Sequence, residues 1–226
     1  MVDEKDSIVG HSNKHNCHRF VPEQPKGLLH RAFSVFLFND EGKLLLQQRA
    51  KSKVTFPSVW TNTCCSHPLY GQHPDEVDLP AAVADGTTPG VKAAAVRKLA
   101  HELGIAPEQV PLQGFRFLTR LHYCAADTHT WGPQAEWGEH EVDYILFIRV
   151  RDRMPAYPNM HARCTHMHTA CVHGRDWAMH TSGMVLSNEL IAGLLLFVWF
   201  MHLQITVHQL HQCHIAAGKG GLDTQP

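Results

Sequence analysis

Residues 27–50 read GLLHRAFSVFLFNDEGKLLLQQRA, and this stretch decides the fold. Two runs rich in apolar residues, Ala32–Phe38 and Lys43–Arg49, flank the sequence Asn-Asp-Glu-Gly at 39–42. Apolar or alternating runs joined by turn-forming residues are typical of an antiparallel β-hairpin. We therefore expect two paired strands here.

The residues that follow alternate between helix and strand patterns. Val91–Leu103 is a predicted helix, with Thr88 as N-cap, a proline in its first turn and Gly104 at its C-terminus. Phe115–Cys124 is a predicted strand whose odd-numbered residues share one face, and Glu139–Val150 is another. Interleaved strands and helices indicate a layered α/β domain.

The chain has 226 residues and changes character near residue 150. We expect one domain over 1–150 and a divergent C-terminal segment, partly helical or disordered, over 151–226. The spacing in the Cys- and His-rich run at 160–174 does not match a zinc finger. The apolar run Leu190–Leu203 is shorter than the roughly 20 residues that cross a bilayer, which favours a buried helix over a membrane anchor.

The overall composition excludes several partners. Lys and Arg number 20 against 21 Asp and Glu, so bulk charge does not attract nucleic acid or an anionic membrane, and any phosphate must be bound locally. Seven cysteines, an odd number, argue for a reducing compartment rather than a disulfide framework. Residues 1–20 lack a signal or transit composition. We expect the cytoplasm by default, or a plastid if a presequence has been removed.

A cysteine pair stands in WTNTCCSHPL at 60–69, which we expect to be a loop after a strand. A thiol becomes a nucleophile or base when a neighbour lowers its pKa or takes its proton, and His67 lies two residues from Cys65. The alternative is a buried structural cysteine, because free cysteines are commonly buried. The pair alone does not decide between them.

Three acidic residues, Glu139, Glu141 and Asp143, alternate along the last predicted strand and share a face. Such a row repels itself unless a cation lies among its members. A mixed set of imidazoles and carboxylates suits Zn²⁺ or Mn²⁺. The alternative is a solvated acidic face with scattered histidines. The candidate imidazoles are His18, His30 and His67.

Basic residues also allow two interpretations. Lys98 and Glu102 lie four apart on the predicted helix, a spacing typical of a surface ion pair. Lys14, Arg49 and Lys53 precede the cysteine pair. They are either ordinary surface charges or a local clamp for phosphate.

Five ordered segments closely resemble type I isopentenyl-diphosphate isomerase. They are NCH at 16–18, GLLHRAFSVFLFN at 27–39, KLLLQQRAKSKVTFPSVWTNTCCSHPL at 43–69, HELGI at 101–105 and WGEHEVDYILF at 137–147. The resemblance implies a Nudix-like layered α/β/α domain with a mixed sheet. RKLAHELGI looks like a degenerate Nudix helix in which His101 replaces a glutamate of the hydrolases, which favours an isomerase over a diphosphate hydrolase.

The resemblance also implies roles for individual residues. The catalytic thiol would be Cys65, and the proton-donating side would hold Glu141 with Tyr123. A tightly bound divalent metal, Mn²⁺ or Zn²⁺, would be held by His18, His30, His67, Glu139 and Glu141. A Mg²⁺ that accompanies the diphosphate would be bound by Glu102, and the diphosphate itself by Lys14, Arg49, Lys53 and Lys98. The substrate and product would be isopentenyl and dimethylallyl diphosphate, handled by a monomer without nucleic acid or membrane.

Two departures from the family pattern limit these expectations. The connection between Tyr123 and Glu139 is long, and we interpret it as a tolerated surface insertion. After Ile148 the expected covering segments of the family are not recognisable. A catalytically inactive homologue therefore remains the main alternative, and a Nudix-type diphosphate hydrolase a lesser one.

Overall fold

The computed structural model describes residues 1–150 and the backbone of 164–171. The expected hairpin is present: β1 (His30–Phe38) and β2 (Lys43–Arg49) pair antiparallel with Phe38 opposite Leu44. The side chain of Asn39 accepts two backbone N–H groups within the turn. Gly42 adopts a φ of 73°, a conformation that glycine reaches without a steric penalty.

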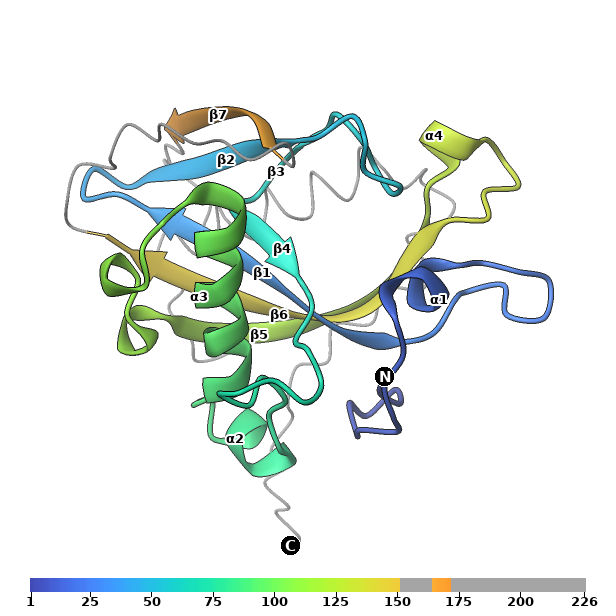
Figure 1. Cartoon of the computed structure of the whole chain (residues 1–226), viewed down its shortest axis with the longest axis horizontal. Coiled ribbons are helices and arrows are strands. Elements are labelled where there is room, and N and C mark those ends of the chain that lie inside the picture. The colour runs from blue at the N-terminus through green and yellow to red at the C-terminus, as the bar shows by residue number, and fades with distance from the viewer. Residues whose placement is uncertain (151–163, 172–226) are drawn as a thin grey trace, which may run out of the picture.

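The hairpin belongs to a mixed sheet, so the predicted fold class is confirmed (Figure 1). The strands run in the order β3-β2-β1-β6-β5, β1 and β6 are parallel, and β4 also pairs with β1. β7 pairs antiparallel with β2, so part of the sequence beyond residue 150 joins the sheet. The remaining strands are β3 (Trp60–Thr61), β4 (Cys64–Ser66), β5 (Arg116–Ala126), β6 (Gly138–Arg149) and β7 (Cys164–Cys171).

The long helix α3 (Pro89–Leu103) crosses one face of this sheet (Figure 1). Leu99 and Leu103 of α3 are buried in one apolar cluster with Phe33 of β1 and Leu146 of β6. A second cluster, which includes Phe36 and other aromatic residues, takes the alternate positions of the same strands. Because successive strand residues point to opposite faces, the two clusters lie on opposite sides of the sheet.

The N-terminus of α3 is capped by a different residue from the predicted one. Thr88 occupies the N-cap position, but its backbone is left-handed at φ 37° and its buried hydroxyl has no hydrogen-bond partner. The carboxylate of Asp78 instead accepts the N–H groups of Gly90 and Val91, at 2.7 and 2.9 Å. Gly104 ends the helix in the left-handed conformation, as predicted.

The expected single face of the strand at 115–124 is wrong. The pairing of β5 with β6 shifts between Phe117 and Thr119, which indicates a β-bulge. Phe117 therefore packs against the cluster under α3, whereas Leu121 and Tyr123 belong to the opposite cluster. A bulge adds one residue to one strand, so the alternation changes face at that point.

Short helices and turns complete the described part. α1 lies beside one end of β6, and α2 lies near the start of α3 (Figure 1). The side chains of the Cys- and His-rich run and the apolar run Leu190–Leu203 lie outside the described residues. Within the described residues, no helix has the length and apolar character needed to span a membrane. The short helices are α1 (Lys14–His18), α2 (Pro80–Ala84), α4 (Thr128–Trp131), and the 3₁₀ turns Pro107–Gln109 and Leu112–Gly114.

Candidate active site

Strand register brings the first site residues together. His30, at the start of β1, lies opposite Glu141 of β6, and Glu141 lies opposite Tyr123 of β5 on its other side. Tyr123 shares the sheet face of the second apolar cluster. His30, Glu141 and Tyr123 therefore continue that apolar face of the sheet.

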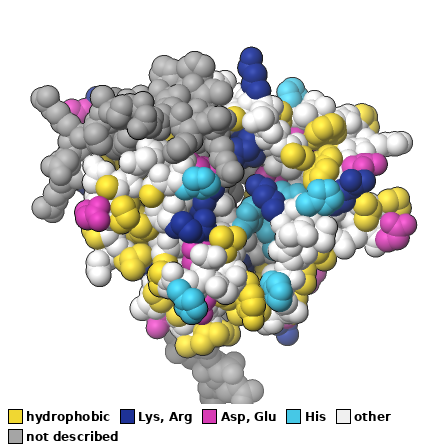
Figure 2. Space-filling model, viewed as in Figure 1, with side chains coloured by type: hydrophobic (Ala, Val, Ile, Leu, Met, Phe, Trp, Pro, Cys, Tyr) yellow, Lys and Arg dark blue, Asp and Glu magenta, His cyan; other side chains and the backbone are white. Residues whose placement is uncertain are grey.

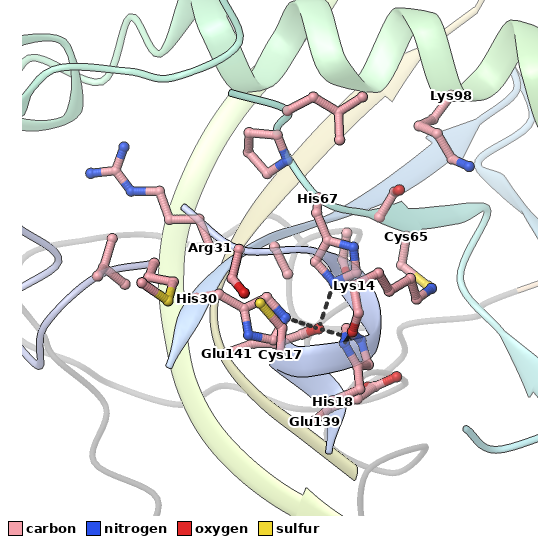
Figure 3. A pocket seen from close by; sticks show the side chains of 18 of the residues that line it. Lys14, Cys17, His18, His30, Arg31, Cys65, His67, Lys98, Glu139 and Glu141 are labelled. Atoms are coloured by element: carbon pink, nitrogen blue, oxygen red, sulfur yellow. Dashed lines mark hydrogen bonds and ion pairs between the residues drawn. The ribbon is translucent and has the colours of Figure 1, made fainter. Parts of the chain in front are cut away.

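Three imidazoles surround one carboxylate oxygen. The ligand atoms of His18, His30, His67 and Glu141 all lie within 4.8 Å of one another. Oε1 of Glu141 is 3.0 Å from Nε2 of His67, 3.5 Å from that of His30 and 3.9 Å from that of His18. Figure 3 shows the three rings converging on the carboxylate from α1, β1 and the residues after β4.

Backbone contacts orient two of these rings. Nδ1 of His18 lies 2.9 Å from the carbonyl of Lys14, and Nδ1 of His30 lies 2.7 Å from that of Leu28. Each Nδ1 must carry the hydrogen to bond a carbonyl, which leaves Nε2 as the lone-pair atom facing the cluster. Nε2 of His30 is buried and has no hydrogen-bond partner. An orphaned buried nitrogen among such neighbours is what a metal-ligating imidazole requires.

The electrostatics of the cluster agree with a donor set for a cation. Burial, with the neighbouring imidazoles, lowers the pKa of His18 and of His67 to about 4, so both rings are neutral at neutral pH. Burial alone would raise the pKa of Glu141, but the neighbouring His30 and His67 bring it well below its usual value. Three imidazoles and one carboxylate fit Zn²⁺ or Mn²⁺.

Glu139 stands beside this cluster rather than within the four converging ligands. Its Oε1 accepts from the hydroxyl of Thr55 and its Oε2 from the hydroxyl of Tyr123, both at 3.0 Å. The same tyrosine hydroxyl donates to Glu141 at 2.5 Å. Burial, followed by the charges of Glu139 and Glu141, raises the pKa of Tyr123 well above its usual value. The phenol therefore carries its proton between two carboxylates.

Asp143 completes the predicted acidic row on the same face. It is buried, and its Oδ2 accepts from the hydroxyl of Ser34 at 2.8 Å. Burial and the charge of Glu141 raise the pKa of Asp143 well above its usual value. This shift favours the uncharged form of Asp143, which would not repel its neighbours in the row.

Cys65 lies on strand β4 and lines the same cavity. The cysteine pair lies in strand β4 rather than in the expected loop, with Cys65 opposite Ser34 of β1. Because neighbours on a strand point to opposite faces, Cys64 is fully buried toward α3, where its thiol lies 3.6 Å from Glu102. Cys64 therefore fits the interpretation of a buried structural cysteine, whereas Cys65 lines the cavity and its reactivity stays a prediction.

Arg49 lies beside the Cys65 thiol. One guanidinium nitrogen is 3.7 Å from Sγ, and the rest of the group is held by the carbonyls of Thr55 and Phe56, at 2.7 and 2.9 Å. Burial raises the pKa of Cys65 to about 11, and the charge of Arg49 opposes that rise. Arg49 is buried, so it is not an ordinary surface charge.

Two lysines meet one carboxylate at the α3 side of the cavity. Oε1 of Glu102 lies 3.0 Å from Nζ of Lys98 and 3.6 Å from Nζ of Lys53. The expected surface ion pair is wrong, because Lys98 and Glu102 are only 6% and 3% exposed. Burial would raise the pKa of Glu102, but the two lysines hold it below its usual value. The packing of α3 against β4 explains the burial.

One cavity of about 370 Å³ unites these groups. Lys, Arg and His side chains gather around the hollow on the face shown in Figure 2. An anion that enters meets several cations, and Cys65 and Tyr123 both line the same space. Every predicted site residue lines it: Lys14, His18, His30, Arg49, Lys53, Cys65, His67, Lys98, Glu102, Tyr123, Glu139 and Glu141.

Sequence reasoning missed two residues that hold the site together. Thr55 bonds both Arg49 and Glu139, and no sequence signal marks that role. Asp127 accepts the N–H of Phe56 at 2.7 Å. The latter had a signal, because Asp127 precedes Thr-His-Thr-Trp as a helix N-cap would.

Comparisons with known proteins agree with the geometry. A family model for the NUDIX domain matches residues 28–170. An isopentenyl-diphosphate delta-isomerase of Gibberella zeae is 54% identical over 66% of this chain and 54% of its own length. The Schizosaccharomyces pombe isomerase is 50% identical over 70% and 64%, and the chloroplastic isomerase I of Arabidopsis thaliana 53% over 67% and 47%. The chain thus spans less than two thirds of each of these relatives.

Proposed function

The chain belongs to the Nudix domain family, and from that premise we propose that it converts isopentenyl diphosphate into dimethylallyl diphosphate. One observation carries the proposal. The His18, His30, His67 and Glu141 cluster lies beside the Tyr123 hydroxyl in the same cavity as the Cys65 thiol and a set of cations. Relatives that are 54% and 50% identical to this chain over the aligned residues bear the name of that isomerase.

The reaction needs an acid and a base on opposite sides of an alkene. Adding a proton to the terminal carbon gives a tertiary carbocation, and removing a proton from the neighbouring carbon forms the new double bond. We assign the donor to the Tyr123 and Glu141 wall and the acceptor to Cys65. A thiol accepts a proton only as its anion; burial raises the pKa of Cys65 and disfavours that anion, whereas the charge of Arg49, 3.7 Å from Sγ, favours it. A proton then returns from Cys65 to the opposite wall between turnovers.

The cations supply the binding energy for the diphosphate. Lys14, Arg49, Lys53 and Lys98 line the cavity and would neutralise an anion that the chain as a whole does not attract. Glu102 sits between two of these lysines and would bind a Mg²⁺ that arrives with the diphosphate. Holding the charged end fixes the alkene between Tyr123 and Cys65.

A second divalent ion, Zn²⁺ or Mn²⁺, would be held by His18, His30, His67 and Glu141. Such an ion polarises a bound carboxylate and steadies its position. Glu139, whose Oε2 accepts from the Tyr123 hydroxyl, would be a further ligand of the same ion. The proposed cofactors are therefore Mg²⁺ and a second divalent ion, Zn²⁺ or Mn²⁺.

The proposal is tested by incubating the purified protein with isopentenyl diphosphate and Mg²⁺. Appearance of dimethylallyl diphosphate supports the isomerase. Release of phosphate products instead would identify a diphosphate hydrolase, and no change in the substrate, with metal bound, would identify an inactive homologue. The products are separated by chromatography of the diphosphates.

Two substitutions test the assigned walls. Cys65→Ala removes the acceptor and Glu141→Gln the carboxylate that bonds Tyr123, and each should lower kcat by about a thousandfold or more, since a positioned acid or base contributes about 10² to 10⁴. His129→Ala, at an exposed residue of α4, serves as the control and should keep wild-type kcat. Near-native turnover in either site variant would remove that residue from the mechanism.

A further inference from the structure

A short turn after β2, residues 54–56, contacts both walls of the site. The carbonyls of Thr55 and Phe56 accept from Arg49, which faces the Cys65 thiol. The hydroxyl of Thr55 donates to Glu139, which in turn accepts from Tyr123. The orientation of the acceptor wall and that of the donor wall therefore depend on the same three residues.

The backbone of this turn adopts an intrinsically unfavourable conformation. Phe56 has a φ of 49°, in the left-handed region, and Ser58 follows with a φ of 63°. A bulky residue in that region costs about 1 to 3 kcal/mol and persists only where the surroundings determine it. The turn therefore needs an external anchor.

The anchor comes from the connection between β5 and β6, which we expected to be an idle insertion. Asp127 accepts the N–H of Phe56 at 2.7 Å, and Trp131 donates its indole N–H to the carbonyl of Val54 at 2.9 Å. The other oxygen of Asp127 accepts from the N–H of Thr130, which fixes the carboxylate at the start of α4. Asp127 is fully buried, whereas Trp131 is half exposed.

We propose that Asp127 is a positioning residue for catalysis: through the N–H of Phe56 it holds the turn that orients Arg49 toward Cys65 and Thr55 toward Glu139. The inference deepens the proposed function and rests on it for its kinetic test. Asp127 does not line the cavity, so it acts through the turn and not on the substrate. Small displacements of reacting groups cost up to about a hundredfold in rate.

The test compares Asp127→Ala, Asp127→Asn and a matched control. Asn39→Ala is the control, because Asn39 also accepts two backbone N–H groups in a turn but lies away from the cavity. Asp127→Ala should lower kcat about tenfold or more, with a smaller rise in KM. Asp127→Asn keeps one oxygen acceptor and should lose less than about threefold. Thermal unfolding of each variant shows how much stability is lost.

A loss of kcat in Asp127→Ala that Asn39→Ala does not share at a similar melting temperature supports the positioning role. Unchanged kcat in Asp127→Ala, equal losses in the two alanine variants, or an Asn variant no better than Ala would each overturn it.

A binding measurement separates this inference from the proposed reaction. Inorganic pyrophosphate with Mg²⁺ is titrated calorimetrically into the wild type and the same variants. Because the turn holds Arg49 and directly follows Lys53, Asp127→Ala should bind pyrophosphate at least about threefold more weakly than Asn39→Ala. If the wild type shows no isomerase activity but Asp127→Ala still binds pyrophosphate more weakly than Asn39→Ala, the proposed reaction is refuted and the positioning role of Asp127 is retained. If the two variants bind pyrophosphate equally, the positioning role is refuted.

Discussion

At the scale of single residues, the chemistry depends on which nitrogen of each imidazole is available. The carbonyls of Lys14 and Leu28 take the hydrogen of Nδ1 in His18 and His30 and leave Nε2 facing Glu141. No hydrogen bond within the described residues uses the buried Nε2 of His30, which lies 3.5 Å from Oε1 of Glu141. A buried nitrogen without a hydrogen-bond partner is unfavourable, and a bound metal ion would supply the missing partner.

Replacing His30 should therefore weaken metal binding before it weakens the fold. We expect His30→Ala to lower the affinity for Zn²⁺ or Mn²⁺ about a hundredfold, since even residues that only orient metal ligands contribute tenfold to a hundredfold. Metal content after dialysis measures the loss. Addition of Zn²⁺ to chelator-treated protein should raise the melting temperature of the wild type but not of the variant. His129→Ala should behave as the wild type, and equal metal content in all three proteins would exclude this cluster.

At the scale of elements, α3 shows how a structure can keep a predicted helix and change what caps it. The sequence placed Thr88 at the N-cap, yet the acceptor for the first N–H groups is Asp78, ten residues earlier in the chain. A capping residue that is distant in sequence has no local pattern. Its position follows from the packing of the preceding segment.

The stability of α3 should follow this assignment. Asp78→Ala leaves two N–H groups without their acceptor, and we expect it to lower the free energy of unfolding by about 2 kcal/mol. Thr88→Ala removes a hydroxyl that has no partner and should cost less than about 1 kcal/mol. Urea denaturation of the two variants measures the difference. A larger loss from Thr88→Ala would assign the cap to the threonine.

The same contrast explains how much of the fold the sequence reveals. The hairpin and α3 were predictable because their apolar periods, turn residues and terminal glycine act locally. The bulge in β5 was not, because it depends on pairing with β6. Strand β4 was mistaken for a loop, since three residues that pair with β1 leave no periodic pattern.

Less of the candidate site than of the fold could be predicted from the sequence. His18, His30, His67 and Glu141 come from separate parts of the chain, and no spacing rule joins them. Their grouping was expected only through resemblance to a family, and the register of β1 with β6 supplies its physical reason. Thr55 and Asp127 remained unseen because their roles depend on contacts made by tertiary packing: Thr55 bonds the side chains of Arg49 and Glu139, and Asp127 accepts the N–H of Phe56.

At the scale of the whole molecule, the first residues of the chain form part of the cavity wall. Met1, Val2, Ile8 and Gly10 line it, and the N–H of Val2 bonds the carbonyl of Leu29 beside β1. One residue ties this segment to the sheet. The buried carboxylate of Asp6 accepts from Arg31 at 2.7 Å, from Arg120 at 2.6 Å and from the hydroxyl of Tyr144.

Removal of that carboxylate should release the segment and destabilise the molecule. Asp6→Ala leaves Arg31, only 8% exposed, without its counter-charge, and breaking a buried pair costs about 3 to 5 kcal/mol. Asp6 also has a φ of 66°, which aspartate and asparagine tolerate better than alanine. Asp6→Asn keeps that tolerance and one acceptor, so it should fall between the wild type and the alanine variant.

Urea denaturation and limited proteolysis near residues 3–9 test this ordering. The matched control is Asp3→Ala, because Asp3 is exposed and its carboxylate accepts the N–H groups of Lys5 and Ser7 within its own turn. The control should leave the denaturation midpoint unchanged, whereas Asp6→Ala should lower it and expose the segment to protease. If both variants unfold like the wild type, the N-terminal wall is held by its apolar contacts, such as Val2 in the cluster under α3, and not by the Asp6 network.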